Sequence, residues 1–140
     1  MIVLSNSQSQ SIAAGGTVTF DTTVLHTGCR PDGCGGAEYH RNGSGTVQLR
    51  PGIYEISFNG NVTSATAGTS VQLAIAIDGT PLPETTMIQN VGTANAFENV
   101  AASTYVRVCC GTNGSISVEN TGTSLLTLAP NSGLSIRRVA

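Results

Sequence analysis

The sequence predicts an all-β fold, an antiparallel sandwich or barrel of about ten strands, and three observations support this prediction. Apolar and polar residues alternate over several segments, Gly, Asn and Pro separate these segments, and apolar residues nowhere recur at helical spacing for more than one turn. The length of 140 residues suits one domain with its own core. We expect residues 17–140 to form this domain, and residues 1–16 to form a short N-terminal arm or first strand.

The segment 49–62 is the predicted core strand. After Pro51-Gly52, a pair that interrupts regular strand structure, the apolar residues Tyr54, Ile56, Phe58 and Val62 alternate with polar ones. Successive side chains of a strand point to opposite faces, so these four residues would line one buried side.

The segment 71–77 is a second predicted strand, with Val71, Leu73, Ile75 and Ile77 on one face. It ends in Asp78-Gly79, a strong hairpin turn signal. A polar loop joins it to the core strand, so we expect the two strands to pair with each other.

The remaining strands follow from the same alternation. Val106 and Val108 should face the core from a long strand at 97–110. Pro81 and Pro83 lack a backbone donor, so 80–90 should form an edge or a loop, while the glycine-rich stretch 27–44 should be a surface loop. The other expected strands are 2–4, 17–20, 22–25, 45–49, 115–120, 125–128 and 134–139.

The composition is poor in charge. Only 10% of the residues are charged, lysine is absent and the formal net charge is -2. Ordinary domains have about a quarter charged residues, and interface cores are depleted of charge, so partner chains are expected to cover part of this surface. Binding of nucleic acid is not expected because clustered positive charge is missing, and membrane insertion is not expected because no long apolar window exists.

The order of these pieces resembles the C1q/TNF-like jelly roll. The similarity rests on Gly45-Thr46-Val47-Gln48-Leu49-x-Pro51-Gly52-x-Tyr54-x-Ile56-x-Phe58, the turn at Asp78-Gly79, the strand to Val108, and Val118-x-Asn120-x-Gly122 before the last strand. It is similar in particular to the small versions that form the C-terminal domains of bacterial exosporium collagen-like proteins or occur in phage fibre and decoration proteins.

The resemblance implies a two-sheet jelly roll that assembles as a homotrimer, with one sheet packed about the threefold axis. It also implies a non-enzymatic protein without a cofactor. The candidates for the core and the trimer interface are Tyr54, Ile56, Phe58, Val62, Leu73, Ile75, Val106 and Val108.

The sequence departs from the collagen-tailed members because no Gly-X-Y repeat precedes the domain. This departure favours a virion decoration or fibre subunit that attaches through Val3 and Leu4. Its partners would then be other virion proteins and a host surface glycan, contacted through loops 27–44 and 90–95. The alternatives are a spore-coat or cell-surface adhesion module among surface-layer proteins, and a carbohydrate-binding lectin, against which the absence of Trp counts.

Four residues in the loop 27–44 and just before it could bind a metal ion or form a disulfide. His26, Cys29, Cys34 and His40 could complete a tetrahedral zinc site, but the cysteine spacing is wider than in zinc fingers. A disulfide between Cys29 and Cys34 is favoured over zinc in an oxidising environment, and two thiols are expected in a reducing one.

Other polar residues are candidates for pairing rather than catalysis. Glu55 and Arg107 interrupt apolar strands and could form a buried or intersubunit ion pair. Strand alternation places Cys110 on the side of Val108 and Cys109 on the opposite side, as two small apolar residues. The sequence has no Gly-x-Ser-x-Gly elbow and no paired carboxylates, which argues against an enzyme.

Overall fold

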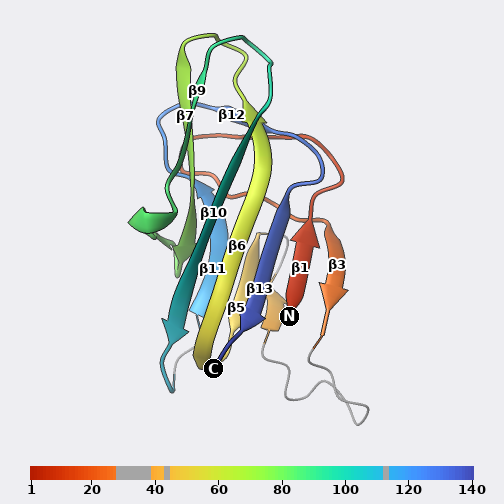
Figure 1. Cartoon of the computed structure of the whole chain (residues 1–140), viewed down its shortest axis with the longest axis vertical. Coiled ribbons are helices and arrows are strands. Elements are labelled where there is room, and N and C mark those ends of the chain that lie inside the picture. The colour runs from red at the N-terminus through yellow and green to blue at the C-terminus, as the bar shows by residue number, and fades with distance from the viewer. Residues whose placement is uncertain (28–38, 43–44, 112–113) are drawn as a thin grey trace.

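The computed structural model describes residues 1–27, 39–42, 45–111 and 114–140, with 39–42 described in backbone only. These residues form thirteen strands in two antiparallel sheets, together with one 3-10 turn, η1 (Pro83–Thr85). The two sheets stack as layers, and the two ends of the chain lie at the same end of the molecule (Figure 1). No helix in this described part is long and apolar enough to cross a membrane.

Sheet A contains seven strands, in the order β2-β12-β6-β13-β1-β3, with β10 paired to the other side of β6. The strands β10, β6, β13, β1 and β3 lie side by side in the front layer of Figure 1. Their bounds are β1 (Ile2–Ser5), β2 (Gln10–Ile12), β3 (Thr22–His26), β6 (Gly52–Thr63), β10 (Glu98–Val108), β12 (Leu126–Leu128) and β13 (Gly133–Arg138).

Sheet B contains six strands, in the order β4-β5-β11-β7-β8, with β9 also paired to β7. The predicted turn at Asp78-Gly79 is confirmed, because Ile77 pairs with Thr80 on either side of it. Both turn residues have positive φ, as a type I′ hairpin turn requires. The bounds are β4 (Tyr39–Asn42), β5 (Thr46–Leu49), β7 (Thr69–Ile77), β8 (Thr80–Pro81), β9 (Met87–Val91) and β11 (Gly114–Asn120).

The predicted pairing of the core strand with the strand that follows it is wrong. The core strand is β6, which pairs with β10, β12 and β13 in sheet A, whereas β7 pairs with β8, β9 and β11 in sheet B. The loop between β6 and β7 therefore carries the chain from one sheet to the other. Each of these strands buries an apolar face, and stacking them in opposite sheets lets both faces share one core.

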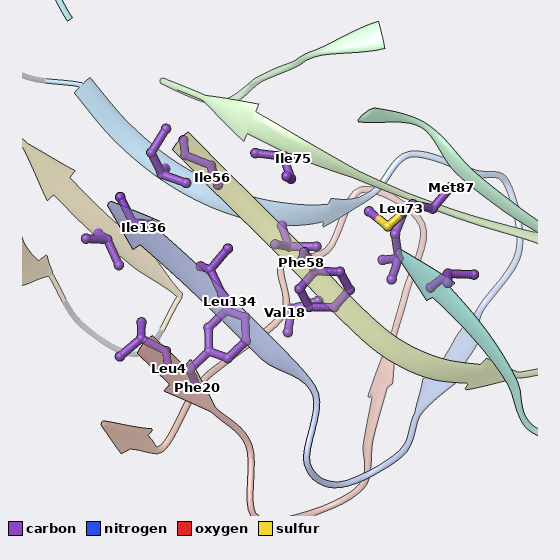
Figure 2. Close-up of a cluster of buried hydrophobic side chains, with 14 of the residues drawn as sticks. Leu4, Val18, Phe20, Ile56, Phe58, Leu73, Ile75, Met87, Leu134 and Ile136 are labelled. Atoms are coloured by element: carbon purple, nitrogen blue, oxygen red, sulfur yellow. The ribbon is translucent and has the colours of Figure 1, made fainter. Parts of the chain in front are cut away.

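The core lies between the two sheets. Side chains of β1, β6 and β13 in sheet A meet side chains of β7 in sheet B (Figure 2). Phe20 and Phe58 are in edge-to-face contact, with ring centroids 6.5 Å apart and an interplanar angle of 69°. The eight residues predicted for the core are all buried: Tyr54, Ile56, Phe58, Val62, Leu73, Ile75, Val106 and Val108.

Two residues of β6 show how its sequence suits the core. Tyr54 is fully buried, and its hydroxyl donates a hydrogen bond of 2.7 Å to the carbonyl oxygen of Arg50, the residue before Pro51-Gly52. Gly60 is buried where a Cβ atom would lie 2.9 Å from Leu128 Cδ1 and 3.2 Å from Phe58 Cζ. The polar tip of the tyrosine is thus satisfied, and the glycine makes room for its neighbours.

Several local predictions need correction. The segment 1–16, expected to be an arm or a first strand, contains a second strand, β2, which pairs with β12, and the predicted surface loop 27–44 contains β4, which pairs with β5. The segment 17–20 is no strand, although Val18 and Phe20 are buried, and only Thr17 forms an isolated bridge. The prediction for 80–90 is confirmed in that β8 and β9 both pair with the outer side of β7.

Asp21 ties the turn after β1 to the start of β3, and it should make stability depend on pH. Hydrogen bonds from the side chain of Ser7, from its backbone N–H at 2.8 Å and from the Thr22 hydroxyl at 2.9 Å lower the pKa of Asp21 below 3.8. A group whose pKa is lower in the folded state than in the unfolded state stabilises the fold. This contribution to the free energy of unfolding is complete at pH values above the unfolded-state pKa, and it is lost as the pH falls through the folded-state pKa.

We therefore expect Asp21→Asn to flatten the acid side of the stability profile below about pH 4. Urea unfolding midpoints at a series of pH values measure this effect, and Ser7→Ala, which removes the largest cause, should act in the same direction. A constant difference between Asp21→Asn and the parent protein across the acid range would contradict the prediction.

Candidate interaction surface

The candidate functional site is the side of sheet A that faces away from the core, over β10, β6, β13 and β1. We call it the open face, and it lies toward the viewer in Figure 1. Its side chains are the partly or fully exposed ones that alternate with the buried residues of these strands. They are Ile53, Glu55, Ser57, Asn59 and Asn61 of β6, Asn99, Ala101, Ser103, Tyr105 and Arg107 of β10, Ser135 and Arg137 of β13, and Val3 and Ser5 of β1.

Strand register arranges the open face in rows. One row is made of small residues, because Ser103, Ser57, Ser135 and Val3 are direct neighbours on four successive strands. Within it the Ser57 hydroxyl donates a hydrogen bond of 3.1 Å to the Ser103 hydroxyl. Short side chains leave this part of the sheet flat, so another surface can approach its backbone closely.

The next row carries an aromatic side chain and an ion pair. Tyr105, Glu55 and Arg137 are neighbours on β10, β6 and β13, and the Arg137 guanidinium binds the Glu55 carboxylate. Tyr105 is 65% exposed, unusually high for an aromatic residue in the middle of a strand. Since Glu55 and Arg137 neutralise each other, Arg107 is the open-face charge that this ion pair leaves uncompensated.

The Glu55 interaction differs from the sequence prediction. We expected Glu55 and Arg107 to pair in the core or between subunits, but Glu55 pairs with Arg137 of the same chain near the surface. Arg107 lies opposite Ile53 in the register of β10 and β6. Sequence reasoning missed Arg137 because it follows Glu55 by 82 residues in the sequence and only the sheet brings them together.

A shallow hollow of about 300 Å³ lies at one end of the open face. Cys109 and Cys110 both line it and are exposed. This corrects the predicted arrangement, in which Cys110 faces the core, because β10 ends at Val108 and the alternation does not continue. The other lining residues are Pro51, Gly52, Ile53, Arg107, Val108, Arg138 and Ala140.

A second hollow lies at the opposite end of β6, between the loops that follow β6 and precede β12. Hydroxyl side chains, Ala65 and Leu125, which is 57% exposed, form its lining. The turn after β9 lies nearby, since Asn95 donates a backbone hydrogen bond of 2.9 Å to Ser64. The predicted surface loop 90–95 lies two residues further along the chain than expected, at 92–97, because residues 90 and 91 belong to β9.

The predicted anchor residues are integral to sheet A. Leu4 is buried in the core, and Val3 is paired on both sides, with Leu25 of β3 and Ser135 of β13. Attachment through Leu4 would require β1 to leave the sheet, whereas the Val3 side chain already lies on the open face.

The predicted zinc or disulfide residues are only partly described. His26 ends β3 and is exposed, and the backbone of residue 40 lies in β4. Cys29 and Cys34 lie outside the described residues. Within the described residues, no three His, Cys, Asp or Glu side chains are grouped as a metal site would require.

Comparisons with known proteins place the fold. No protein-family model matches the chain, and no curated protein matches it in sequence. Among solved structures, it is similar to the globular domain of zebrafish complement 1qA protein, with a TM-score of 0.69 and 9% identity over 99% of this chain and 96% of that one.

Two further solved structures agree. Eiger TNF from S. frugiperda has a TM-score of 0.70 and 11% identity, covering 99% of this chain and 91% of that one. Murine APRIL at pH 5.0 has a TM-score of 0.67 and 15% identity, covering 99% and 97%. The chain therefore has the two-sheet antiparallel jelly-roll fold of C1q and TNF domains, as the sequence predicted.

Proposed function

We propose that this protein is a non-enzymatic structural module that assembles as a homotrimer through the open face. The observation that carries the proposal is the chemistry of that face. Short polar side chains lie around one exposed tyrosine, the Glu55–Arg137 ion pair is satisfied within the chain, and Arg107 is the one charge that this pair leaves uncompensated. Interface cores are enriched in tyrosine and arginine, so Tyr105 and Arg107 are side chains that such an interface favours.

Two further observations support assembly. The chain has few charges for its size, which fits a surface that partner chains cover in part. In the described residues, β10 pairs with β6 alone, so its other edge has no strand partner, and Gln89 of β9 and Glu84 of η1 hydrogen-bond to the side chains of Glu98 and Thr104. The resemblance to C1q/TNF-like jelly rolls also implies a trimer built around one sheet.

The proposal extends to the setting in which the trimer works. We place it on the outside of a particle, as a virion decoration or fibre subunit that contacts other virion proteins and the host surface. The resemblance to phage fibre and decoration proteins supports this setting. Peptide mass spectrometry of purified phage particles from the producing host tests it, and absence of the protein from all such particles would refute it.

A charge placed on the open face tests the assembly. Tyr105→Asp should raise the dissociation constant of the trimer about a hundredfold or more, because a buried and unpaired charge costs on the order of 3 kcal/mol. Light scattering should give about 43 kDa for the parent, three times 14.3 kDa, and a mass near 14.3 kDa for the variant.

The matched control is Ile88→Asp on β9 of sheet B, where Ile88 is 57% exposed and lies outside the open face. It should remain a trimer. Ala101→Arg on β10 is a second open-face variant, in case Tyr105→Asp is poorly folded beside Glu55. A monomeric parent protein, or equal dissociation of the open-face and control variants, would overturn the proposal.

A further inference from the structure

Two adjacent exposed cysteines stand at the corner where the open face ends. β10 ends at Val108, Cys109 follows it directly, and Cys110 and Gly111 lie in a turn in which Gly111 has a φ of 81°. Both cysteines line the hollow beside Ile53 and Arg107, two residues of the open face. The pair therefore borders the surface proposed to contact other protomers.

The corner belongs to two surfaces at once. It borders Ile53 and Arg107 of the open face, and it also lies at the end of β10, which pairs with β6 alone in the described part of the sheet. In a cyclic trimer each protomer presents one surface to the next protomer and a different surface to the previous one. Because the cysteine pair lies where the open face meets the end of β10, it is placed to contact both the next and the previous protomer.

A bond between the two neighbouring cysteines of one chain is geometrically unfavourable. Consecutive Cα atoms lie about 3.8 Å apart, whereas disulfide-bonded cysteines have Cα atoms about 4.4–6.8 Å apart. Oxidation of this pair therefore favours partners on another chain.

Threefold symmetry explains why two cysteines would be needed. One cysteine per chain can join only two of three protomers, because the third is left without a partner. Two cysteines that play different roles can close the ring, since each chain contributes one to the next protomer and the other to the previous one.

We propose that Cys109 of one protomer forms a disulfide with Cys110 of the next, so that three such bonds lock the trimer covalently. This inference rests on the proposed trimer. Each bond forms by thiol–disulfide exchange with a small-molecule disulfide such as oxidised glutathione. Two protein thiols lose two protons and two electrons, and the small disulfide is reduced to two thiols.

The test uses the full chain with Cys29→Ser and Cys34→Ser, so that Cys109 and Cys110 are the remaining cysteines of the four. The protein is incubated with oxidised glutathione and examined by denaturing electrophoresis without reductant and by intact mass spectrometry. We expect a covalent trimer of about 43 kDa, three times 14.3 kDa, that reductant converts to single chains.

Single variants test the pairing rule. In that background, Cys109→Ser alone and Cys110→Ala alone should give no covalent dimer or trimer of the protein, and their single thiol should form only a mixed disulfide with glutathione. When the two variants are unfolded and refolded together, oxidation should yield covalent dimers that contain one chain of each, which their different masses identify. Covalent dimers of one variant with itself would overturn the inference. A bond between Cys109 and Cys110 of one chain, in the protein that keeps both cysteines, would also overturn it.

Light scattering in reductant separates this inference from the proposed function. A trimer in reductant that gives no covalent trimer with oxidised glutathione would overturn the disulfide ring and leave the proposed function standing. A monomer in reductant that also gives no covalent trimer would overturn both.

Discussion

Replacing Phe58 by alanine is expected to lower the free energy of unfolding by roughly 3–5 kcal/mol. Phe58 is 1% exposed at the centre of β6, and its ring meets the Phe20 ring across the core. Truncation removes both the buried apolar area and the ring contact, and it leaves a cavity that neighbouring strands cannot close. Denaturant unfolding followed by circular dichroism measures the change, and the melting temperature should fall by about 10 °C or more.

The matched control is Phe97→Ala, because Phe97 is 47% exposed just before β10. Its loss should change the free energy of unfolding by about 0.5 kcal/mol or less. Both proteins should be compared in reductant and at one concentration, since assembly adds to apparent stability. Equal destabilisation by the two variants would show that Phe58 does not carry the core as described.

Replacing Asn120 by alanine is expected to cost about 2–4 kcal/mol, although it removes few atoms. Asn120 is 1% exposed at the end of β11. Its Nδ2 donates to the carbonyl oxygens of Ile12 and Ser124, each at 2.9 Å, and its Oδ1 accepts from the backbone N–H of Gly122 at 3.0 Å. The substitution deprives three backbone groups of the partner that ties β2 and the turn before β12 to sheet B.

Asn59→Ala is the control for this prediction, because Asn59 is exposed on the open face of β6. In reductant and at concentrations where both proteins have the same assembly state, its effect should stay near 0.5 kcal/mol. Asn120→Asp keeps the acceptor but loses the donor, so it should be destabilised as well. If Asn120→Ala had the same free energy of unfolding as the parent protein, water would be replacing the lost side chain. The hydrogen bonds of Asn120 would then contribute little to stability.

The sequence by itself determined which residues form the main strands and which of their side chains are buried. The alternation of apolar and polar residues over 54–62 and 71–75 was sufficient to identify the buried side chains, because successive side chains of any strand point to opposite faces. The eight predicted core residues are buried for this reason. The turn at Asp78-Gly79 could also be predicted from neighbouring residues alone, because these two residue types readily adopt the positive φ that both have in the structure.

Only the tertiary structure decided which strands pair and where polar groups meet. Consecutive strands β6 and β7 separate into different sheets, and Arg137 reaches Glu55 through a pairing between distant parts of the chain. The burial of Asn120 and the corner position of Cys109 and Cys110 arise in the same way. Alternation reports the face of a residue but carries no information on its neighbouring strand, which the packing of the whole core selects.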